Sequence, residues 1–295
     1  MQEPFRSGYV SIIGRPNVGK STLLNAILGQ KVSIVAARPQ TTRNKILGVK
    51  NLPGAQIIFI DTPGIHRPKS LLGAVMVKSA RDVLSDIDIV LFVAEAGGDS
   101  GRDDIIIQSL KGTDKPVFLL LNKIDRVRKP EILHMIDQYR GLFSFKEIFP
   151  VSSLKKDGID NVVEKLLVYL PEGPRYYPED IVTDQIERFM AAEIIREKIM
   201  GKTSEEIPYS VAVEVQNWAE RQDGIVSISA NIYVEREGQK GIIIGEKGRM
   251  LKEIGTLARI EIERLLDARV FLQLWVKVKK GWRDDKKMLQ ELGYK

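Results

Sequence analysis

The chain has 295 residues, enough for two domains, and its 43% hydrophobic and 28% charged residues are ordinary for a soluble globular protein. It contains no cysteine, which excludes disulfide frameworks and thiolate metal sites, and no apolar run approaches the roughly 20 residues of a membrane-spanning helix. The net charge is +6, but residues 176–295 contain 20 basic against 21 acidic residues, so a nucleic-acid surface there would be a local patch.

Strands and helices are predicted to alternate through the first half of the chain. Apolar runs of strand length lie at residues 9–14, 56–60, 87–94, 117–121 and 148–151, and a further strand is expected at Val49. Helix-like segments lie between them, at residues 20–28, 72–84, 102–110, 130–143 and 159–169. This alternation predicts an α/β domain in which a mostly parallel sheet is covered by helices on both faces.

A change of pattern follows a proline-rich stretch at residues 171–178, which we interpret as part of a linker. We therefore expect a first domain at residues 1–174, a linker at 175–182 and an α+β domain with a basic C-terminal tail at 183–295. The second domain is expected to have the order α-β-β-α-α-β, at residues 183–200, 209–218, 226–235, 239–244, 249–266 and 270–278, with Thr183 capping the first helix.

The segment GRPNVGKS lies between the first predicted strand and helix and matches the phosphate-binding pattern GxxxxGK[ST]. Its backbone N–H groups and the following helix dipole would cradle a phosphate chain, with Lys20 at the β- and γ-phosphates and Ser21 on Mg²⁺. The alternative is a tight strand–helix turn with a surface lysine. The predicted nucleotide-binding residues here are Gly14, Arg15, Pro16, Asn17, Val18, Gly19, Lys20, Ser21 and Thr22.

A second motif, Asp61-Thr62-Pro63-Gly64, directly follows the predicted strand at 56–60. At this position the Asp61 carboxylate can hold Mg²⁺ through a water molecule, and the Gly64 N–H can sense the γ-phosphate. The Thr42 hydroxyl is expected to complete the shell around the metal when its loop closes. Without the preceding phosphate loop, this motif would be read as an ordinary turn.

The third motif, Asn122-Lys123-Ile124-Asp125, ends the strand at 117–121 and is predicted to select the base. The Asp125 carboxylate can accept hydrogen bonds from the ring N–H and the amino group of guanine, whereas adenine offers no such pair of donors. Asn122 would buttress the loops, and the Lys123 stem would lie over the base. After the last strand, Ser152, Ser153 and Leu154 could contact the guanine oxygen through backbone N–H groups. The alternative for each motif is a simple loop.

A glycine-rich turn, GEKG, lies between two predicted helices of the second domain. Its glycines would let a phosphate backbone approach, and Ile243, Ile244 and Ile254 could floor a groove for unstacked bases. A second basic patch holds Lys277, Lys279, Lys280 and Arg283, with Trp275 and Trp282 interleaved. The predicted RNA-binding residues are Ile244, Gly245, Glu246, Lys247, Gly248, Arg249, Lys252, Lys277 and Lys280. The alternative is a helix-turn-helix with a solvated basic face.

The ordered set GRPNVGKS, TT, DTPG, NKID and VSSL resembles the translation-factor-type P-loop GTPases, over most of the first 155 residues. The runs RPQTTRNKILGV, EREGQKGIIIGEKG and LWVKVKKGW extend the resemblance to the bacterial ribosome-assembly GTPases with a C-terminal type II KH domain. This resemblance implies hydrolysis of GTP to GDP with Mg²⁺, binding of 16S ribosomal RNA near its 3′ end and assistance to 30S subunit assembly.

The resemblance also sets expectations about location and partners. The short polar N-terminus lacks a signal-peptide core, so we expect a cytoplasmic protein. Relatives suggest weak peripheral contact with the cytoplasmic face of the inner membrane, although no lipidation motif or amphipathic anchor is evident. We expect a monomer with RNA, not DNA, as its partner.

Two departures from the Ras pattern bear on catalysis. Ras-type switches place a water-orienting glutamine directly after the DxxG glycine, but this chain has Ile65, so slow intrinsic hydrolysis is expected. The neighbouring His66 is interpreted as a solvated loop residue. Asn17 raises the hypothesis of a potassium ion against the phosphates, and the alternative is that Asn17 only stabilises the loop.

The motifs leave three hypotheses to compare. The first is a GTPase in which Lys20, Thr42 and Gly64 act by positioning and charge neutralisation, with switch loops at residues 38–45 and 65–72. The second is an RNA-binding protein with an inert nucleotide site, which retention of the phosphate and metal residues argues against. The third is an ATPase that acts on RNA, which Asp125 argues against.

Overall fold

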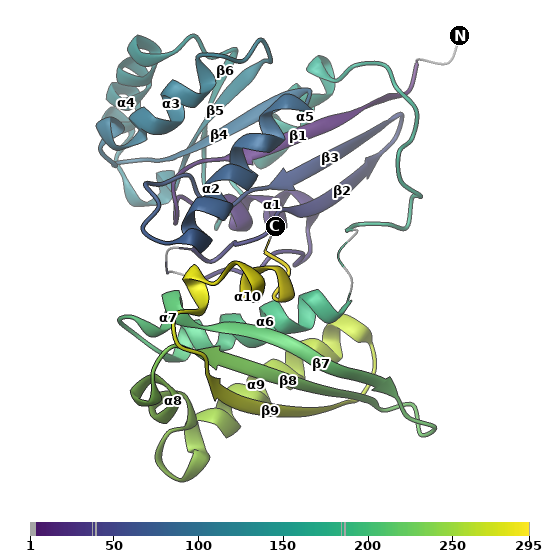
Figure 1. The fold of residues 1–295 in the computed structure, drawn as a ribbon. Helices are drawn as coiled ribbons and strands as arrows, with labels where there is room; N and C mark the ends of the chain where they lie inside the picture. Colours follow the sequence, from purple (N-terminus) through teal and green to yellow (C-terminus); the bar gives the residue numbers. More distant parts are fainter. Residues whose placement is uncertain (1–3, 37, 39, 184, 186, 295) are drawn as a thin grey trace. The chain divides into compact units, whose positions relative to one another are not determined.

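The computed structural model describes residues 4–36, 38, 40–183, 185 and 187–294. The chain forms two compact units, each with its own sheet (Figure 1). The first unit comprises residues 1–35, 42–68 and 73–184, and the second comprises residues 36–41, 69–72 and 185–295. Among the described residues, no helix is both long and apolar enough to cross a membrane.

The first unit is built on a six-stranded sheet in the order β2-β3-β1-β4-β5-β6. β2 pairs antiparallel with β3, and the other neighbours are parallel. The strands are β1 (Arg6–Ile13), β2 (Ile46–Leu52), β3 (Ala55–Asp61), β4 (Ile89–Glu95), β5 (Val117–Asn122) and β6 (Glu147–Val151). The predicted mostly parallel sheet is therefore confirmed. The carboxyl ends of the parallel strands all lie at the same end of the sheet.

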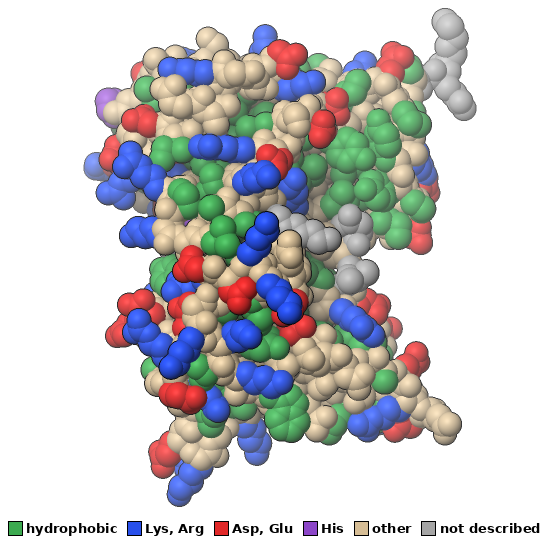
Figure 2. Space-filling model, viewed as in Figure 1, with side chains coloured by type: hydrophobic (Ala, Val, Ile, Leu, Met, Phe, Trp, Pro, Cys, Tyr) green, Lys and Arg blue, Asp and Glu red, His purple; other side chains and the backbone are tan. Residues whose placement is uncertain are grey.

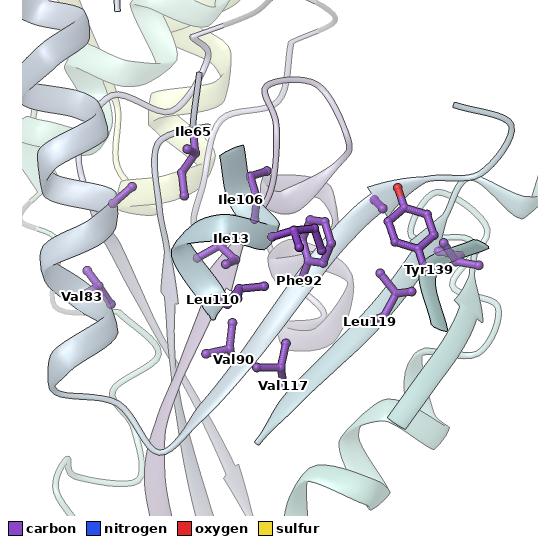
Figure 3. Close-up of a cluster of buried hydrophobic side chains, with 14 of the residues drawn as sticks. Ile13, Ile65, Val83, Val90, Phe92, Ile106, Leu110, Val117, Leu119 and Tyr139 are labelled. Atoms are coloured by element: carbon purple, nitrogen blue, oxygen red, sulfur yellow. The ribbon is translucent and has the colours of Figure 1, made fainter. Parts of the chain in front are cut away.

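Helices cover both faces of this sheet, as expected for strands that are apolar on both sides (Figure 1). They are α1 (Lys20–Leu28), α2 (Leu71–Asp82), α3 (Asp104–Leu110), α4 (Lys129–Leu142) and α5 (Ile159–Tyr169). One core joins the central strands to α3 and α4, with Phe92 and Leu119 packed near Ile106 and Tyr139 (Figure 3). This packing fixes the strand ends from which the loops of the candidate site emerge.

The proline-rich stretch that we interpreted as a linker is bound to the first unit. Gln56, buried in β3, donates from its side-chain amide to the Tyr177 carbonyl and accepts from the Tyr176 and Tyr177 N–H groups. The Val49 N–H donates to the Val182 carbonyl at 2.7 Å. Residues 176–182 therefore pack along strands β2 and β3 of this sheet.

The second unit has a three-stranded sheet in the order β7-β8-β9, covered on one face by helices α6, α8 and α9. β7 and β8 are antiparallel, and β8 and β9 are parallel. The elements are α6 (Glu187–Lys202), α7 (Ile207–Ser210), β7 (Ala212–Glu220), β8 (Val226–Val234), α8 (Glu237–Ile244), α9 (Arg249–Leu266), β9 (Val270–Val278) and α10 (Lys286–Glu291). The predicted α-β-β-α-α-β order is present within this longer series.

One detail of the second-unit prediction was wrong. Tyr209 and Ser210 belong to the short helix α7, not to the following strand, which begins at Ala212. The Thr183 hydroxyl donates to the Leu47 carbonyl at 2.7 Å, and its capping of the first helix stays a prediction. The C-terminal tail contains helix α10, which Asp285 caps by accepting from two backbone N–H groups. Positions 184 and 186 of the predicted first helix lie outside the described residues.

Candidate nucleotide site and RNA groove

The phosphate-binding loop spans the gap between the end of β1 and the start of α1. Helix α1 begins at Lys20, and Gly19 precedes it with φ of 102°, in the left-handed region that favours glycine. A Cβ at Gly19 would also overlap the side-chain amide of Asn122. The loop therefore needs glycine here both for its curvature and for the close approach of a second motif.

Lys20 lies in the interior of this loop, with 5% of its surface exposed. Its ammonium group donates to the carbonyls of Gly14 at 3.1 Å and Arg15 at 2.9 Å. Burial lowers the pKa of Lys20 to about 8, although the Asp61 charge opposes this effect. A phosphate chain would supply the anionic partner that this buried ammonium group lacks in the loop.

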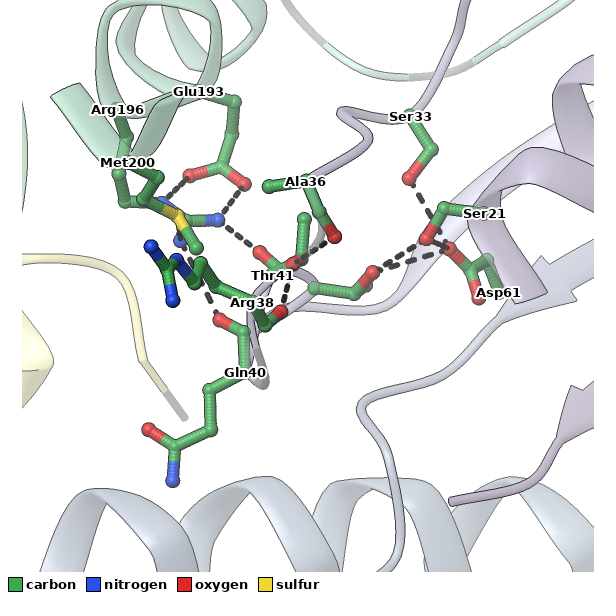
Figure 4. Close-up of polar contacts among 11 residues, drawn as sticks. Ser21, Ser33, Ala36, Arg38, Gln40, Thr41, Asp61, Glu193, Arg196 and Met200 are labelled. Atoms are coloured by element: carbon green, nitrogen blue, oxygen red, sulfur yellow. Dashed lines mark hydrogen bonds and ion pairs between the residues drawn. The ribbon is translucent and has the colours of Figure 1, made fainter. Parts of the chain in front are cut away.

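Asp61 gathers hydroxyl groups from three segments at the end of β3 (Figure 4). Its Oδ2 accepts from Ser21 Oγ at 2.7 Å, from Ser33 Oγ at 3.1 Å and from Thr42 Oγ1 at 3.4 Å. The Ser21 and Thr42 hydroxyl oxygens are 2.7 Å apart. Burial raises the pKa of Asp61, and Lys20 and the three hydroxyls oppose that rise.

This cluster fits a hard divalent cation. Asp61 Oδ1 is buried and, among the described residues, has no hydrogen-bond partner, so one carboxylate oxygen is available as a ligand or water acceptor. Within the described ranges no three acidic, histidine or cysteine side chains form a metal cluster. A single carboxylate with hydroxyls is typical of Mg²⁺ held jointly by protein and phosphate oxygens. The predicted Mg²⁺ residues Ser21, Thr42 and Asp61 are thus brought together.

The DxxG motif lies directly against the phosphate loop. A Cβ at Gly64 would come within 2.6 Å of the Pro16 nitrogen, so only glycine allows this approach. The Thr62 hydroxyl donates to the Ile12 carbonyl at 2.8 Å, which anchors the motif to β1. Ile65 is buried, and the His66 ring lies 2.8 Å from the Gly64 carbonyl. The Ile65 side chain itself carries no polar group that could orient a water molecule.

Asn122 connects the base-selecting motif to two other loops. Its amide donates to the Val18 carbonyl at 2.8 Å, and its Oδ1 accepts from the Ser153 N–H and hydroxyl, both at 2.9 Å. The buttressing role expected of Asn122 is therefore present. Thr22 continues helix α1 and Pro63 is buried beside Gly64, so both lie within the same group of loops.

Asp125 is exposed at the rim, where a base could reach it. The Ser152 hydroxyl donates to its carboxylate at 2.5 Å and holds the pKa of Asp125 below its usual range, so the acceptor stays ionised. Lys123 has φ of 69°, and its ammonium group contacts Glu95 Oε1 at 2.8 Å. Leu154 is 68% exposed. The two ends of the site, near Lys20 and Asp125, are thus formed from separate strand ends of one sheet.

Sequence reasoning missed Asp103, at the start of α3. This buried carboxylate accepts from Arg15 Nε at 2.7 Å and from the Tyr139 hydroxyl at 2.6 Å. Burial raises the pKa of Asp103, and its two partners oppose that rise. The Arg15 side chain therefore anchors the phosphate loop to α3 and α4. No sequence signal identified Asp103, Ser33 or Glu95, because each becomes significant only through a distant partner.

The GEKG turn of the second unit joins α8 to α9. Gly245 and Gly248 have φ of 72° and 78°, and Lys247 has φ of 51°. Glu246 and Lys247 are exposed, and Arg249 begins α9. A groove of about 390 Å³ continues from Gly248 between α9 and β9. It is lined by Gly248, Leu251, Lys252, Gly255, Thr256, Arg259, Leu272 and Leu274.

Two predictions about this surface were wrong. Ile243 and Ile254 are fully buried in the core beneath the helices, so the apolar lining of the groove comes instead from Leu251, Leu272 and Leu274. Trp282 is also fully buried, and its indole N–H donates to the Ser210 carbonyl at 2.9 Å. Trp282 is therefore a structural residue and does not belong to a basic, RNA-facing patch.

Lys277 and Trp275 are exposed and alternate along β9 with the residues that face the core. They therefore lie on the opposite face of the strand from the groove-lining leucines. Lys280 is exposed beyond the end of β9, whereas Arg283 pairs with Glu235 at 2.5 Å. Basic and acidic side chains are mixed over the visible face of the second unit, in agreement with its balanced charge (Figure 2).

Comparison with known proteins identifies both units. The family described as "50S ribosome-binding GTPase" matches residues 9–123, and the family described as "KH domain" matches residues 206–283. GTPase Era of Geobacter metallireducens is 55% identical over 293 residues, covering 99% of this chain and 98% of the relative. The chain belongs to the Era family of GTPases.

Other Era proteins support the same assignment. GTPase Era of Ruminiclostridium cellulolyticum is 53% identical over 99% of this chain and 98% of its own length. A variant of Aquifex aeolicus Era, solved with GDP and AlF4⁻, is 44% identical, with a TM-score of 0.95 over 98% of this chain and 99% of that one. An Era structure with MgGDPNP and nucleotides 1506–1542 of 16S ribosomal RNA is 45% identical, with a TM-score of 0.96 over the same shares.

Proposed function

We propose that this Era-family GTPase binds 16S ribosomal RNA near its 3′ end through the groove beside GEKG, and that it uses hydrolysis of GTP to GDP to time this binding during 30S subunit assembly. One observation carries the proposal. Three features lie at the carboxyl ends of the strands of one sheet: a buried lysine in a phosphate loop, hydroxyl groups around the Asp61 carboxylate, and the ionised acceptor Asp125. The same chain also has a groove beside GEKG.

The nucleotide site would act by positioning and charge neutralisation. Lys20 would bind the β- and γ-phosphates, and the Gly64 N–H would sense the γ-phosphate. Ser21, Thr42 and Asp61 would hold Mg²⁺, which when bound offsets the negative charge that develops on the phosphate oxygens. Ile65 cannot orient water, so backbone groups or a partner must do so and intrinsic hydrolysis is slow. The switch loops are residues 38–45 and 65–72, of which position 39 lies outside the described residues.

The RNA site would combine close backbone approach with an apolar groove. The glycines of GEKG admit the phosphates, and Lys247, Arg249 and Lys252 supply positive charge beside them. Leu251, Leu272 and Leu274 would contact unstacked bases. The crystallised relative bound to nucleotides 1506–1542 supports this partner. Lys277, on the opposite face of β9, and Lys280, beyond the end of that strand, remain predicted RNA contacts.

We also propose a potassium ion beside Asn17 as the charge that compensates for the missing glutamine. Asn17 is exposed in the loop with φ of 68°, a backbone conformation that asparagine tolerates, which also fits a purely structural role. Hydrolysis should then be faster in potassium than in sodium. Equal rates in the two salts would remove this proposal and leave the structural role.

Several expectations stay predictions. The domain limits at 1–174, 175–182 and 183–295 are proposed as the functional boundaries. Cytoplasmic location follows from the proposed ribosomal partner, and weak peripheral contact with the inner membrane, a monomeric state and the absence of a DNA partner are also proposed. Fractionation tests the location and the membrane contact, and the mass of the protein in solution tests the monomeric state.

The proposed function is tested by RNA binding in two nucleotide states. Labelled RNA with the sequence of nucleotides 1506–1542 should bind the full chain with different affinities when the protein holds GDPNP or GDP. Lys247→Asp should weaken binding by about tenfold or more, because it reverses charge beside the phosphates. The matched control is Lys287→Asp, which changes an exposed lysine on α10 outside the groove. Equal RNA affinity for Lys247→Asp and wild type, or labelled GTP displaced equally by ATP and GTP, would overturn the assignment.

A further inference from the structure

Helix α6 of the second unit contains a charged side chain that is almost fully enclosed. The Arg196 guanidinium is 1% exposed and forms a two-point ion pair with Glu193, through Nε to Oε1 at 2.8 Å and Nη2 to Oε2 at 2.6 Å. Its Nη1 also contacts the Met200 sulfur at 3.2 Å. An enclosed guanidinium is stable only when its remaining N–H groups also find acceptors.

Those acceptors are backbone carbonyls of a short segment from the first half of the sequence. Residues 36–41 belong to the same compact unit as α6. Arg196 Nη2 donates to the Thr41 carbonyl, and Nη1 reaches the Gln40 carbonyl at 3.5 Å (Figure 4). The Thr41 hydroxyl donates back to the Arg38 carbonyl at 2.6 Å. The guanidinium therefore contacts two consecutive backbone carbonyls of a loop that also has an internal hydrogen bond.

The held peptide group is the one that leads into Thr42. The Thr41 carbonyl and the Thr42 N–H are parts of one planar peptide unit, so fixing that oxygen orients the backbone of Thr42. The Thr42 hydroxyl lies 2.7 Å from Ser21 Oγ and 3.4 Å from Asp61 Oδ2. These are the oxygens that we proposed would surround Mg²⁺.

We propose that Arg196 is a positioning residue for GTP hydrolysis: by holding the 40–41 backbone it presents the Thr42 hydroxyl to the metal and γ-phosphate. The inference rests on the proposed function of that site. Helix α6, in the second half of the sequence, thus helps to order the loop before Thr42 when GTP is bound.

The variant that tests this idea must not leave a buried charge unpaired. Replacing both members of an enclosed ion pair by apolar residues of similar size is generally tolerated. The double variant Glu193→Leu/Arg196→Met should therefore fold and should lack only the contact with the loop. Arg196→Lys is the second variant, which keeps the charge beside Glu193 but cannot donate in the same planar fork. The matched control is Lys202→Met, because Lys202 lies on the same helix and its ion-pair partner, Glu253 of α9, is exposed, so no buried charge is left unpaired.

Expected results are specific to the γ-phosphate state. The double variant should hydrolyse GTP about tenfold more slowly and require more Mg²⁺ for half-maximal rate, because a displaced Thr42 binds the ion less well. Arg196→Lys should lie between it and wild type. GDP affinity should be unchanged, since GDP presents no γ-phosphate, and Lys202→Met should match wild type throughout. Adding Thr42→Ala to the double variant should slow hydrolysis no further than Thr42→Ala alone.

Two outcomes would overturn the inference. Wild-type rate and Mg²⁺ dependence in both Arg196 variants would show that the contact does not position Thr42. If the rate losses of Thr42→Ala and of the double variant multiplied when the changes were combined, Arg196 would act independently of Thr42. A wild-type protein that neither binds nor hydrolyses GTP would instead refute the proposed function itself.

Discussion

At the scale of single residues, the nucleotide site depends on two groups whose surroundings set their charge. Lys20 is enclosed, and its pKa is lowered to about 8, whereas Asp125 at the rim is kept ionised by a hydroxyl donor. The Lys20 end of the site therefore favours an anionic phosphate, and the Asp125 end favours a base with two adjacent N–H donors.

The state of Lys20 makes nucleotide binding depend on pH. Phosphate favours the protonated lysine, so the bound pKa is higher than about 8 and binding takes up a proton once the pH exceeds that value. GTP affinity should be nearly constant below pH 7.5 and should fall as pH rises through 8 toward 9, by up to about tenfold per unit. Calorimetry in buffers of different ionisation enthalpy measures the proton uptake.

The control for this measurement is Lys20→Arg. Arginine stays charged across the whole range, so any binding that remains should lose its dependence on pH between 7.5 and 9. If wild-type affinity showed the same flat profile as Lys20→Arg, the ammonium group would not be the titrating group.

Asp125 determines the choice of base. In Asp125→Asn only one acceptor oxygen remains: the new NH2 group can donate to the oxygen of xanthine but would face the guanine amino group donor to donor. GTP affinity should fall by about 100-fold or more, while xanthosine triphosphate becomes the better ligand. Competition against labelled GTP and labelled xanthosine triphosphate measures both changes, and Ser152→Ala serves as a milder control that removes only the supporting hydroxyl. A variant that still preferred guanine would contradict the assigned role.

At the scale of secondary-structure elements, the site is produced by strand ends rather than by any one helix. β1, β3, β5 and β6 each finish at the same edge of the sheet, and each is followed by one motif. Asp103 adds a further connection, because it anchors Arg15 of the phosphate loop to Tyr139 on α4. In the second unit, α9 and β9 form the groove, whereas the segment after β9 serves packing through Trp282.

The structural role of Trp282 gives a prediction at this scale. Trp282→Phe keeps a ring beside Tyr294 but leaves the Ser210 carbonyl without its indole donor, which should cost about 1–2 kcal/mol in the free energy of unfolding. RNA affinity at temperatures where the variant is folded should match wild type. The matched control, Trp275→Phe, changes an exposed ring and should alter stability by less than about 0.5 kcal/mol. Loss of RNA binding without loss of stability in Trp282→Phe would restore the original RNA-facing interpretation.

At the scale of the whole molecule, the chain consists of two compact units with separate cores. The partition does not follow the sequence, since residues 36–41 and 69–72 belong with the second unit. The loop that leads to Thr42 therefore belongs to the second unit up to residue 41 and to the first unit from residue 42.

Two cores predict two separate responses to ligands. GTP with Mg²⁺ at 100 times its dissociation constant should stabilise the first unit by about 2.7 kcal/mol, and the 16S RNA fragment should stabilise the second. Hydrogen exchange of the buried strands β5 and β8 separates the two effects, because each strand reports on one core. Equal protection of both strands by GTP alone would show that the units unfold together.

The sequence by itself determined the parts of this protein that local rules control. The alternation of apolar runs predicted the parallel sheet, and motifs such as GRPNVGKS carried their chemistry because their residues act within one loop. Helices α1 and α9 begin at the predicted residues, directly after glycine.

Only the tertiary structure decided the roles that depend on a distant partner. Ser33, Asp103 and Arg196 show no local pattern for these roles, since the contacts with Asp61, Tyr139 and Thr41 that define them join residues 28 or more positions apart along the chain. The same cause explains why Trp282 was misjudged, because burial depends on which elements pack around a side chain. Hydrogen bonds and burial are properties of spatial neighbours, and a single sequence specifies those neighbours only after the chain has folded.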